Sequence, residues 1–440
     1  MRDPDGKIIF DGKWVIRKLN ESADQNHFLR SSLAKRLVEQ ALLMPYEWID
    51  EKTLKIPRLG FVTYPNEWSE QQFYMAASLT LKIQSISVSE GWDLKDASVW
   101  NIVFDGLKPI FVDHLSFVRL NHKYWKAGGQ FTRHFIFPLV LGRYNKLEPS
   151  QCIQLWRDGV PTTHARSILG HKRFLTPFWF LMIEGNSRYS TGINNEDSFA
   201  DVKNTRAGLI SGLEYFVKKL EPRKVTKKKS VWSHYESERK HYTEQSISHK
   251  KQVVSSWLTE ISPKWVLDIG CNAGEFSDLA VSSGAKAICW DADPNALAAL
   301  CFRHAGKDSY FPILSAIDDL TGGRGWIGKE YSGLPDRLHE KCDVAMLLAV
   351  IHHLSIACAI RYEDLFCFIN LVTSRYALLE ILSELDEKVI DLCEVYGRNP
   401  ADFSVDNQYD AIKESGFKVI NRCDLVKSNT RHLVLLEKIT

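Results

Sequence analysis

Residues 264–291 read "KWVLDIGCNAGEFSDLAVSSGAKAICWD", and this stretch decides the fold of the C-terminal part of the chain. An apolar run ends in a turn that contains Gly270 and Gly274. The next residues have helical periodicity up to Gly284, which is placed to end a helix. A second apolar run ends in Asp291. The pattern predicts two strands of a parallel sheet joined by a crossover helix.

The same stretch predicts a ligand at the carboxyl edge of that sheet. Glycines after the first strand let a ligand approach the backbone, and Asp291 can accept hydrogen bonds from both hydroxyls of a ribose. Residues 270–274 (G-C-N-A-G) lack the G-x-G-x-x-G spacing that seats a pyrophosphate. Asp268 would repel a phosphate but suits the ammonium group of a methionine. These features favour S-adenosylmethionine over NAD.

On these residues, "VLDIGCNAGEFS" resembles the first motif of class I S-adenosylmethionine-dependent methyltransferases. Further along, "CDVAMLLAVIHHL" is similar to their fourth strand, and "YALLEIL" to their fifth. The closing "GFKVINRCDLVKSNTRHLVLLEK" resembles their final antiparallel pair. The resemblance implies an α/β domain over residues 253–440, with a Rossmann-like seven-stranded methyltransferase sheet. It also implies a transferase that carries out methylation.

The resemblance further implies which residues bind the cofactor. "ILSAIDDL" resembles the segment that flanks the adenine, and Asp318 is its better placed acid. A helix before the first strand often covers the cofactor in such enzymes, which suggests Tyr242 and Lys250 as lid residues, although packing alone would explain the aromatic side chain. The other expected cofactor-binding residues are Asp268, Gly270, Cys271, Asn272, Gly274, Asp291, Ala292 and Leu348.

Two histidines follow the fourth strand, where the transferable methyl group is expected. Imidazole titrates near neutral pH, so His352 or His353 could act as the general base for an oxygen or nitrogen nucleophile. The alternative is that both residues only shape the pocket. We carry them forward as the candidate catalytic residues.

A second constellation lies in the N-terminal half, in the stretch "LKDASVWNIVFDGLKPIFVDHLSF" over residues 94–117. Upstream, the sequence predicts a hairpin at Asp11-Gly12, a helix over residues 28–43 and, over residues 59–68, a strand that leads into a hinge. This order resembles the kinase and aminoglycoside-phosphotransferase fold, which implies an α+β kinase-like domain. In that resemblance Asp96 accepts the acceptor's proton, and Asn101 and Asp113 hold magnesium.

The N-terminal half also departs from the kinase pattern. It has no glycine-rich loop, only "WVIRK" in place of the lysine strand, and Leu94 where a histidine is usual. His-Leu follows Asp113 instead of Phe-Gly. We therefore expect a degenerate kinase-like domain that binds the acceptor or acts as a scaffold. The alternative is an active domain that depends on magnesium and ATP, which would make the enzyme bifunctional.

Length and composition set the remaining bounds. We predict a kinase-like domain over residues 1–217, a charged connector with a lid helix over residues 218–252, and the methyltransferase domain after it. The net charge of +2 argues against nucleic acid as a partner, and the basic cluster at residues 218–229 is interpreted as a solvated linker. Nine cysteines without metal-ligand spacing, no signal peptide and no apolar run of about 20 residues favour the cytoplasm.

Taken together, the two halves resemble a bacterial family of two-domain methyltransferases, the nodulation protein NoeA type. The shared features are the residue 94–117 stretch, "KYWKAGGQFTRHFIFPLVL", the glycine turn and the "HHL" ending. The resemblance implies a small-molecule, glycan or lipid-linked saccharide acceptor. An RNA or protein methyltransferase is the alternative within the same chemistry.

Overall fold

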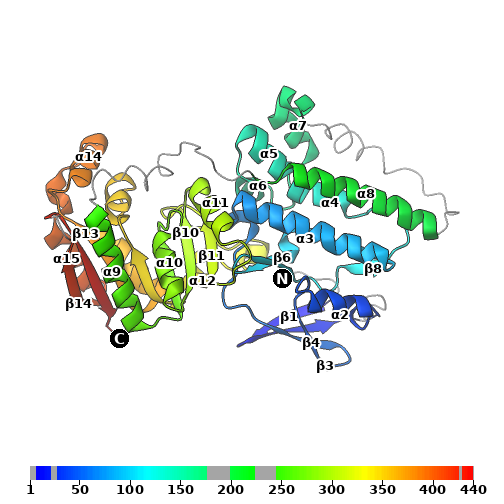
Figure 1. Cartoon of the computed structure of the whole chain (residues 1–440), viewed down its shortest axis with the longest axis horizontal. Coiled ribbons are helices and arrows are strands. Elements are labelled where there is room, and N and C mark those ends of the chain that lie inside the picture. Colours follow the sequence, from blue (N-terminus) through cyan, green and yellow to red (C-terminus); the bar gives the residue numbers. More distant parts are fainter. Residues whose placement is uncertain (1–5, 21–26, 176–198, 223–243, 426–428, 440) are drawn as a thin grey trace. The chain divides into compact units, whose positions relative to one another are not determined.

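A computed structural model describes residues 6–20, 27–175, 199–222, 244–425 and 429–439 (Figure 1). The chain forms two compact units, Met1–Lys224 and Val225–Thr440. Helix α8 (Phe199–Lys219) belongs to the first unit and helix α9 (Glu244–Ile261) to the second. The connector predicted over residues 218–252 therefore overlaps the end of α8, and its predicted end falls inside α9. Helix α9, which corresponds to the lid helix predicted within this range, packs against α10.

The N-terminal unit begins with a four-stranded antiparallel sheet in the order β1-β2-β4-β3. Its strands are β1 (Gly6–Asp11), β2 (Trp14–Leu19), β3 (Glu47–Asp50) and β4 (Thr53–Pro57). The first hairpin turns at Gly12, whose φ of +53° suits glycine, as the Asp-Gly pair predicted. Helix α2 (Ser32–Glu39) is shorter than predicted because the Ser31 side chain caps it at Ala34 N.

The rest of the N-terminal unit is mainly helical, and its longest buried element is α3 (Glu70–Ser89). Ser69 and Gln72 form a capping box at its start, and α8 packs against it. Buried Arg206 on α8 donates to Asp93 Oδ1 and Oδ2 at 3.0 and 2.9 Å, which ties α8 to this unit. The remaining elements are β5 (Trp92–Leu94), β6 (Ile102–Asp105), β7 (Lys108–Phe111), β8 (Phe117–Arg119), α4 (Gly128–Phe131), α5 (Phe137–Asn145), α6 (Pro149–Leu155) and α7 (Thr162–Leu169).

The C-terminal unit is built on one seven-stranded sheet in the order β11-β10-β9-β12-β13-β15-β14. The first five strands in this order are parallel, whereas β15 is antiparallel to both of its neighbours. The strands are β9 (Trp265–Ile269), β10 (Lys286–Asp291), β11 (Tyr310–Leu314), β12 (Cys342–Leu347), β13 (Thr373–Leu382), β14 (Phe417–Asp424) and β15 (Arg431–Lys438). Their parallel core is buried, as continuous apolar runs predict.

Helices cover this sheet in two groups. Helix α9 packs against α10, and α12 and α15 pack against α13. The strand order reverses between β9 and β12, so right-handed crossovers put the two groups on opposite faces. The helices are α10 (Glu275–Ser282), α11 (Pro294–Arg303), α12 (Leu334–Leu338), α13 (Tyr362–Val372), α14 (Glu387–Tyr396) and α15 (Val405–Glu414). The carboxyl edge at the β9–β12 reversal is where such sheets bind ligands.

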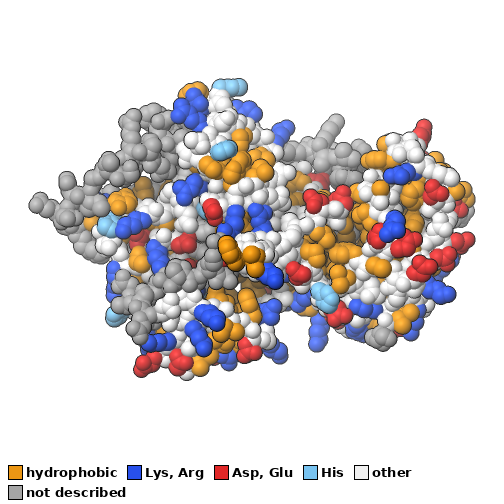
Figure 2. Space-filling view, turned by 180° about the vertical axis from the view of Figure 1, so that it is seen from behind, with side chains coloured by type: hydrophobic (Ala, Val, Ile, Leu, Met, Phe, Trp, Pro, Cys, Tyr) orange, Lys and Arg blue, Asp and Glu red, His pale blue; other side chains and the backbone are white. Residues whose placement is uncertain are grey.

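Surface charge on the described residues is mixed. On the face that Figure 2 shows, basic and acidic side chains are interspersed, and no continuous basic patch forms among them. Among the described residues, no helix has the length and apolar character that a membrane crossing requires. All nine cysteines are free thiols, and six of them are buried.

Candidate active site

The glycine turn after β9 brings the backbone close to the segment that follows β12. Gly270 has a φ of +73°, and a Cβ added there would lie 2.3 Å from Val350 Cγ2. Any side chain at this position would therefore push the two segments apart. The N–H groups of Gly270 and Cys271 donate to Trp290 O at 2.8 and 3.1 Å, which ties the turn to β10.

Asp291 at the end of β10 is hydrogen-bonded to the same turn. Its Oδ2 accepts from Asn272 N at 2.7 Å, and its Oδ1 accepts from Asp293 N at 2.8 Å. Asn272 has a φ of +49°, so its N–H points at the carboxylate from a left-handed backbone. Burial raises the pKa of Asp291, although the backbone donors oppose this rise. The structure thus brings the predicted turn and the predicted ribose acid together.

Asp268, the last acid before the turn, is buried at the base of the site. Its Oδ2 accepts a hydrogen bond from Ser277 Oγ at 2.6 Å. Burial raises the pKa of Asp268 to about 7; nearby Asp291 adds to the rise, and Ser277 and Lys250 oppose it. A cation placed beside this carboxyl would favour its charged form. The group therefore suits an ammonium ligand.

The two histidines lie on the turn after β12, at the start of a short π-helical segment over residues 353–357. The rings of His352 and His353 are 4.2 Å apart between centroids. Burial lowers the pKa of His353 to about 4, and the charges of Lys388 and Arg431 lower it further. Burial also lowers the pKa of His352, as does the neighbouring His353. Both imidazoles are therefore neutral at physiological pH and able to accept a proton.

A buried ion-pair network was missed by the sequence reasoning. Lys250 Nζ on α9 lies 2.5 Å from Glu380 Oε2 on β13, and both side chains are buried. Arg431 Nη1 lies 3.9 Å from Glu380 Oε1, and Arg431 also donates to both carboxylate oxygens of Asp386 at 2.7 and 2.8 Å. The ammonium of Lys250 lies 4.8 Å from the centroid of the Phe276 ring. The only signal in the sequence was a lone acid inside the apolar run "YALLEIL".

This network changes the interpretation of Lys250. The residue was predicted to contact the cofactor from a lid helix, but its ammonium is paired with Glu380, which fixes α9 to the sheet. Tyr242, the other predicted lid residue, lies outside the described residues.

The remaining predicted cofactor residues lie at the ends of three strands. Leu348 is buried directly after β12, and Ala292 is exposed directly after β10. Asp318 is exposed in the segment after β11. Burial raises the pKa of Cys358, and Asp318 beside it adds to that rise, which puts Asp318 next to the segment that follows the histidines.

In the N-terminal unit, the three kinase-like residues also come together. Asn101 Nδ2 lies 3.5 Å from Asp96 O and 3.4 Å from Ser116 Oγ. Ser116 Oγ in turn donates to Asp113 Oδ2 at 2.5 Å. Burial raises the pKa of Asp96, and the charge of Asp113 adds to the rise.

Arg17 on β2 lies beside Asp113, the residue that the kinase resemblance assigned to magnesium binding. Its Nη2 lies 2.9 Å from Asp113 Oδ1, and the arginine side chain is buried. Burial alone would raise the pKa of Asp113, but Arg17 and Ser116 bring it below its ordinary value. Within the described ranges, no group of three or more His, Cys, Asp or Glu residues could hold a metal ion. The acid is therefore neutralised by the protein itself.

Comparisons with known proteins complete the description of the site. No family model matches the chain. The nodulation protein NoeA of Rhizobium meliloti (strain 1021) is 26% identical over 410 residues, which cover 88% of this chain and 85% of NoeA.

Two solved structures have a similar arrangement over less than half of this chain. Magnesium protoporphyrin IX methyltransferase (ChlM) from Synechocystis PCC 6803 with bound SAH is 14% identical, with a TM-score of 0.34, and covers 47% of this chain and 97% of its own. The N-methyltransferase NodS from Bradyrhizobium japonicum WM9 is 12% identical, with a TM-score of 0.31, and covers 43% of this chain and 96% of its own.

The C-terminal unit has the structural features that the class I methyltransferase motifs predicted. The strand order reverses next to a glycine turn, an acid ends the second strand, and a buried acid precedes the turn. The carboxylate of Asp291 at the end of β10 and the buried carboxyl of Asp268 before the turn fit a ribose and an ammonium group rather than a pyrophosphate.

Proposed function

We propose that the chain is a class I S-adenosylmethionine-dependent methyltransferase that acts on a small-molecule or glycan acceptor. The observation that carries the proposal is the contact between the glycine turn and Asp291 through Asn272 N at 2.7 Å. It holds the ribose-side acid and the ligand-facing turn in one rigid arrangement at the point where the strand order reverses.

The proposed cofactor roles follow from the chemistry of each residue. Gly270 lets the turn pack closely against Val350 after β12, and Asp268 accepts hydrogen bonds from an ammonium group. Asp291 uses the lone pairs that its backbone donors leave free to accept from the ribose hydroxyls. When bound, S-adenosylmethionine supplies an electrophilic methyl group. The chain's own residues bind and orient the two reactants and remove a proton.

We assign the acceptor side to the turn that bears His352 and His353. Their pKa values are lowered by burial, so a neutral ring nitrogen is available to take the proton of an oxygen or nitrogen nucleophile. Within the broader class of small molecules, we propose a glycan or lipid-linked saccharide, the acceptor that the sequence resemblance to the NoeA type implies. The free cysteines support a reducing compartment such as the cytoplasm.

For the N-terminal unit we propose a degenerate kinase-like domain that binds the acceptor or acts as a scaffold. The meeting of Asp96, Asn101 and Asp113 supports the kinase-like ancestry. The Arg17–Asp113 ion pair argues against phosphoryl transfer, because the guanidinium holds the acid that would otherwise bind magnesium. The alternative is a bifunctional enzyme whose N-terminal domain is active and depends on magnesium and ATP. A nucleotide-binding test distinguishes it from the degenerate domain.

Calorimetric titration of the full chain with S-adenosylhomocysteine tests the cofactor assignment. Asp291→Asn keeps an oxygen for Asn272 N–H but loses the charge, so affinity should fall by about 1.5–3 kcal/mol, the scale of a charge-assisted hydrogen bond. Asp293→Asn is the matched control, since it removes one acid two residues away and asparagine still caps α11. Absence of binding by the wild type, or equal losses in both variants, would overturn the assignment.

The acceptor is identified by a separate experiment. The chain is incubated with isotopically labelled S-adenosylmethionine and fractionated metabolites, saccharides, RNA and protein, and mass spectrometry locates the label. Label in small molecules or saccharides supports the proposal, and label confined to RNA or protein refutes this acceptor class.

A further inference from the structure

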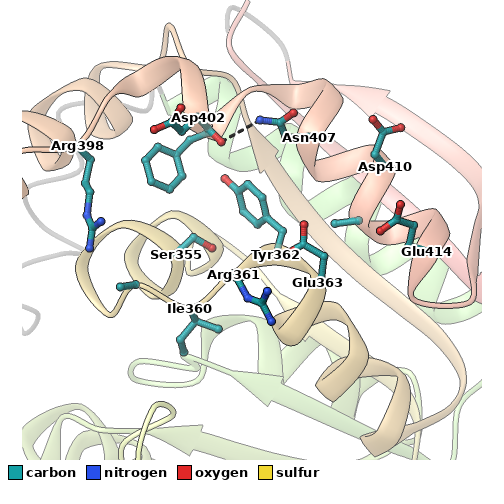
Figure 3. A pocket seen from close by; sticks show the side chains of 13 residues that line it. Ser355, Ile360, Arg361, Tyr362, Glu363, Arg398, Asp402, Asn407, Asp410 and Glu414 are labelled. Atoms are coloured by element: carbon teal, nitrogen blue, oxygen red, sulfur yellow. Dashed lines mark hydrogen bonds between the residues drawn. The ribbon is translucent and has the colours of Figure 1, made fainter.

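A second cavity in the C-terminal unit lies apart from the glycine turn. It has a volume of about 520 Å³, within the range of small-molecule sites. Its walls come from the segment that follows the histidines, from the start of α13 and from α15 (Figure 3). Tyr362 and Phe403 form an aromatic wall, with their rings in edge contact at 6.3 Å between centroids. None of the proposed cofactor residues lines it.

A buried hydroxyl on the cavity wall has no hydrogen-bond partner. Ser355 lines the cavity, is 6% exposed, and its Oγ has no partner among the described residues. Leaving a buried hydroxyl unsatisfied costs about 1–3 kcal/mol. The Ser355 side chain is drawn at the cavity wall in Figure 3, two residues after His353. A ligand group that reached it would supply the missing partner.

The charges on the cavity wall are predominantly acidic. Asp410 and Glu414 stand at i and i+4 on α15, and no described residue forms an ion pair with either. Like charges at this spacing destabilise a helix, and Glu414 is the last residue of α15, where the helix dipole disfavours an anion. Glu363 adds a third acid from α13. These three acids therefore do not stabilise α15.

Neither arginine on the wall forms an ion pair with Asp410 or Glu414. Arg361 donates from Nε and Nη2 to Asp364 at 2.8 and 3.0 Å, so its charge is already matched. Arg398 lies at the other end of the cavity from Asp410 and Glu414 (Figure 3). The side of the cavity lined by α15 is therefore left with an uncompensated negative charge.

We propose that this cavity binds a small organic polyamine or another ligand bearing an amine. The ammonium groups pair with Asp410 and Glu414, the carbon chain lies against Tyr362, and a polar group of the ligand meets Ser355 Oγ. This inference goes beyond the methyltransferase proposal and does not depend on it. Because Ser355 and the histidines share one short segment, the ligand lies next to the proposed acceptor side.

The test titrates the full chain with spermidine by calorimetry and by NMR, with triacetylated spermidine as an uncharged probe of the same skeleton. We expect saturable one-to-one binding of spermidine and none of the acetylated compound. S-adenosylhomocysteine is titrated in parallel. Loss of its binding alone would refute the proposed methyltransferase, whereas absence of spermidine binding alone would refute this site.

Matched variants separate the site from general surface charge. Asp410→Asn with Glu414→Gln should weaken spermidine binding by about tenfold or more, the effect of losing charge-assisted hydrogen bonds. Asp391→Asn with Glu394→Gln removes the same charge from exposed positions on α14 and should leave binding unchanged. Equal losses in both double variants would mean that spermidine binds through the overall charge, and the proposal would fail.

Ser355→Ala gives a readout that a purely structural role would not produce. Its hydroxyl has no partner in the free chain, so the melting temperature should not fall. Spermidine affinity should nevertheless drop about threefold to tenfold, because a hydrogen bond formed only in the complex is lost. Unchanged affinity together with unchanged stability would remove Ser355 and the inner part of the cavity from the site.

Discussion

Lys250 and Glu380 are 130 residues apart in the sequence and form a buried ion pair, with 2.5 Å between Nζ and Oε2. The pair fastens the helix that precedes the first strand to the strand that follows the histidines. Arg431, at the start of β15, approaches the same carboxylate at 3.9 Å. Three segments of the C-terminal unit are thus held by one carboxylate.

Removing one member of this pair should lower the free energy of unfolding. Replacing a partner in a buried ion pair costs about 3–5 kcal/mol, because the other charge stays buried. We expect Glu380→Gln to be worse than Lys250→Met, since the Glu380 carboxylate lies beside both Lys250 and Arg431 and its loss removes a negative charge from both. Denaturant unfolding measures both. Lys251→Met is the control on the same helix, and its exposed pair with Glu275 should be worth about 1 kcal/mol or less.

Asp268 gives a pH prediction with a defined sign. Its pKa is raised to about 7, so the folded chain holds a proton that the unfolded chain has lost. Its contribution to stability is present at low pH and is lost as pH rises from about 4 to 7, by up to about 1.4 kcal/mol per pH unit. The histidines act in the opposite direction between pH 4 and 6.5, because the pKa of His353 is lowered to about 4. The difference between wild type and Asp268→Asn isolates the aspartate.

The same group predicts proton release on cofactor binding. An ammonium beside Asp268 would lower its pKa, so binding of S-adenosylhomocysteine near pH 7 should release a fraction of one proton. Calorimetry in two buffers of different ionisation enthalpy measures this fraction, and Asp268→Asn should abolish it. An identical proton count in the variant would contradict the assigned role.

The Arg17–Asp113 pair predicts that the N-terminal unit does not bind magnesium and ATP. A ligand at 100 times its dissociation constant stabilises the native state by about 2.7 kcal/mol, which a melting curve detects easily. We expect no such shift with ATP and magnesium. Asp113→Asn should lower the melting temperature, because it removes the negative charge from an ion pair whose guanidinium is buried. A magnesium-dependent shift in the wild type that disappears in Asp113→Asn would instead establish an active, bifunctional enzyme.

The histidines can be tested through turnover once label transfer is observed. If either is the base, its replacement by alanine should reduce turnover by about 10²–10⁴-fold and leave the affinity for S-adenosylhomocysteine intact. With the pKa of His353 near 4, its protonation should not change the rate between pH 6 and 8. Near-normal turnover in both alanine variants would leave the two residues with a pocket-shaping role.

The parts of the fold that sequence predicted well are those decided by local chemistry. Gly270 and Gly274 lie, as predicted, in a turn, and both have positive φ; Asp293 and Pro294, residues typical of a helix start, begin α11. Residues 59–68 were predicted as a strand that leads into a hinge, and the strand was wrong. Pro65 starts a short 3₁₀ turn there, and Glu67 Oε2 accepts from Tyr64 N at 3.0 Å, so local side-chain bonds replace strand pairing.

The parts that sequence did not predict depend on contacts between distant segments. Glu380 was unremarked because only the order of the strands brings Lys250 and Arg431 to it. Arg17 was noted only as part of "WVIRK", a poor match to the kinase lysine strand, and its pairing with Asp113 spans 96 residues. Likewise, Asp410 and Glu414 line a cavity only because α15 packs against α13.

The position of β15 has a consequence for how this chain is synthesised. β15 follows β14 in the sequence but lies between β13 and β14 in the sheet. While a ribosome is still producing residues 431–438, β13 has an open edge and β14 has no strand to pair with. Exposed edges of this kind recruit other chains, so the nascent protein passes through a period in which aggregation competes with completion of the sheet. The same delay postpones the arrival of Arg431 at Glu380, so the ion-pair network is completed only when the last strand has been made.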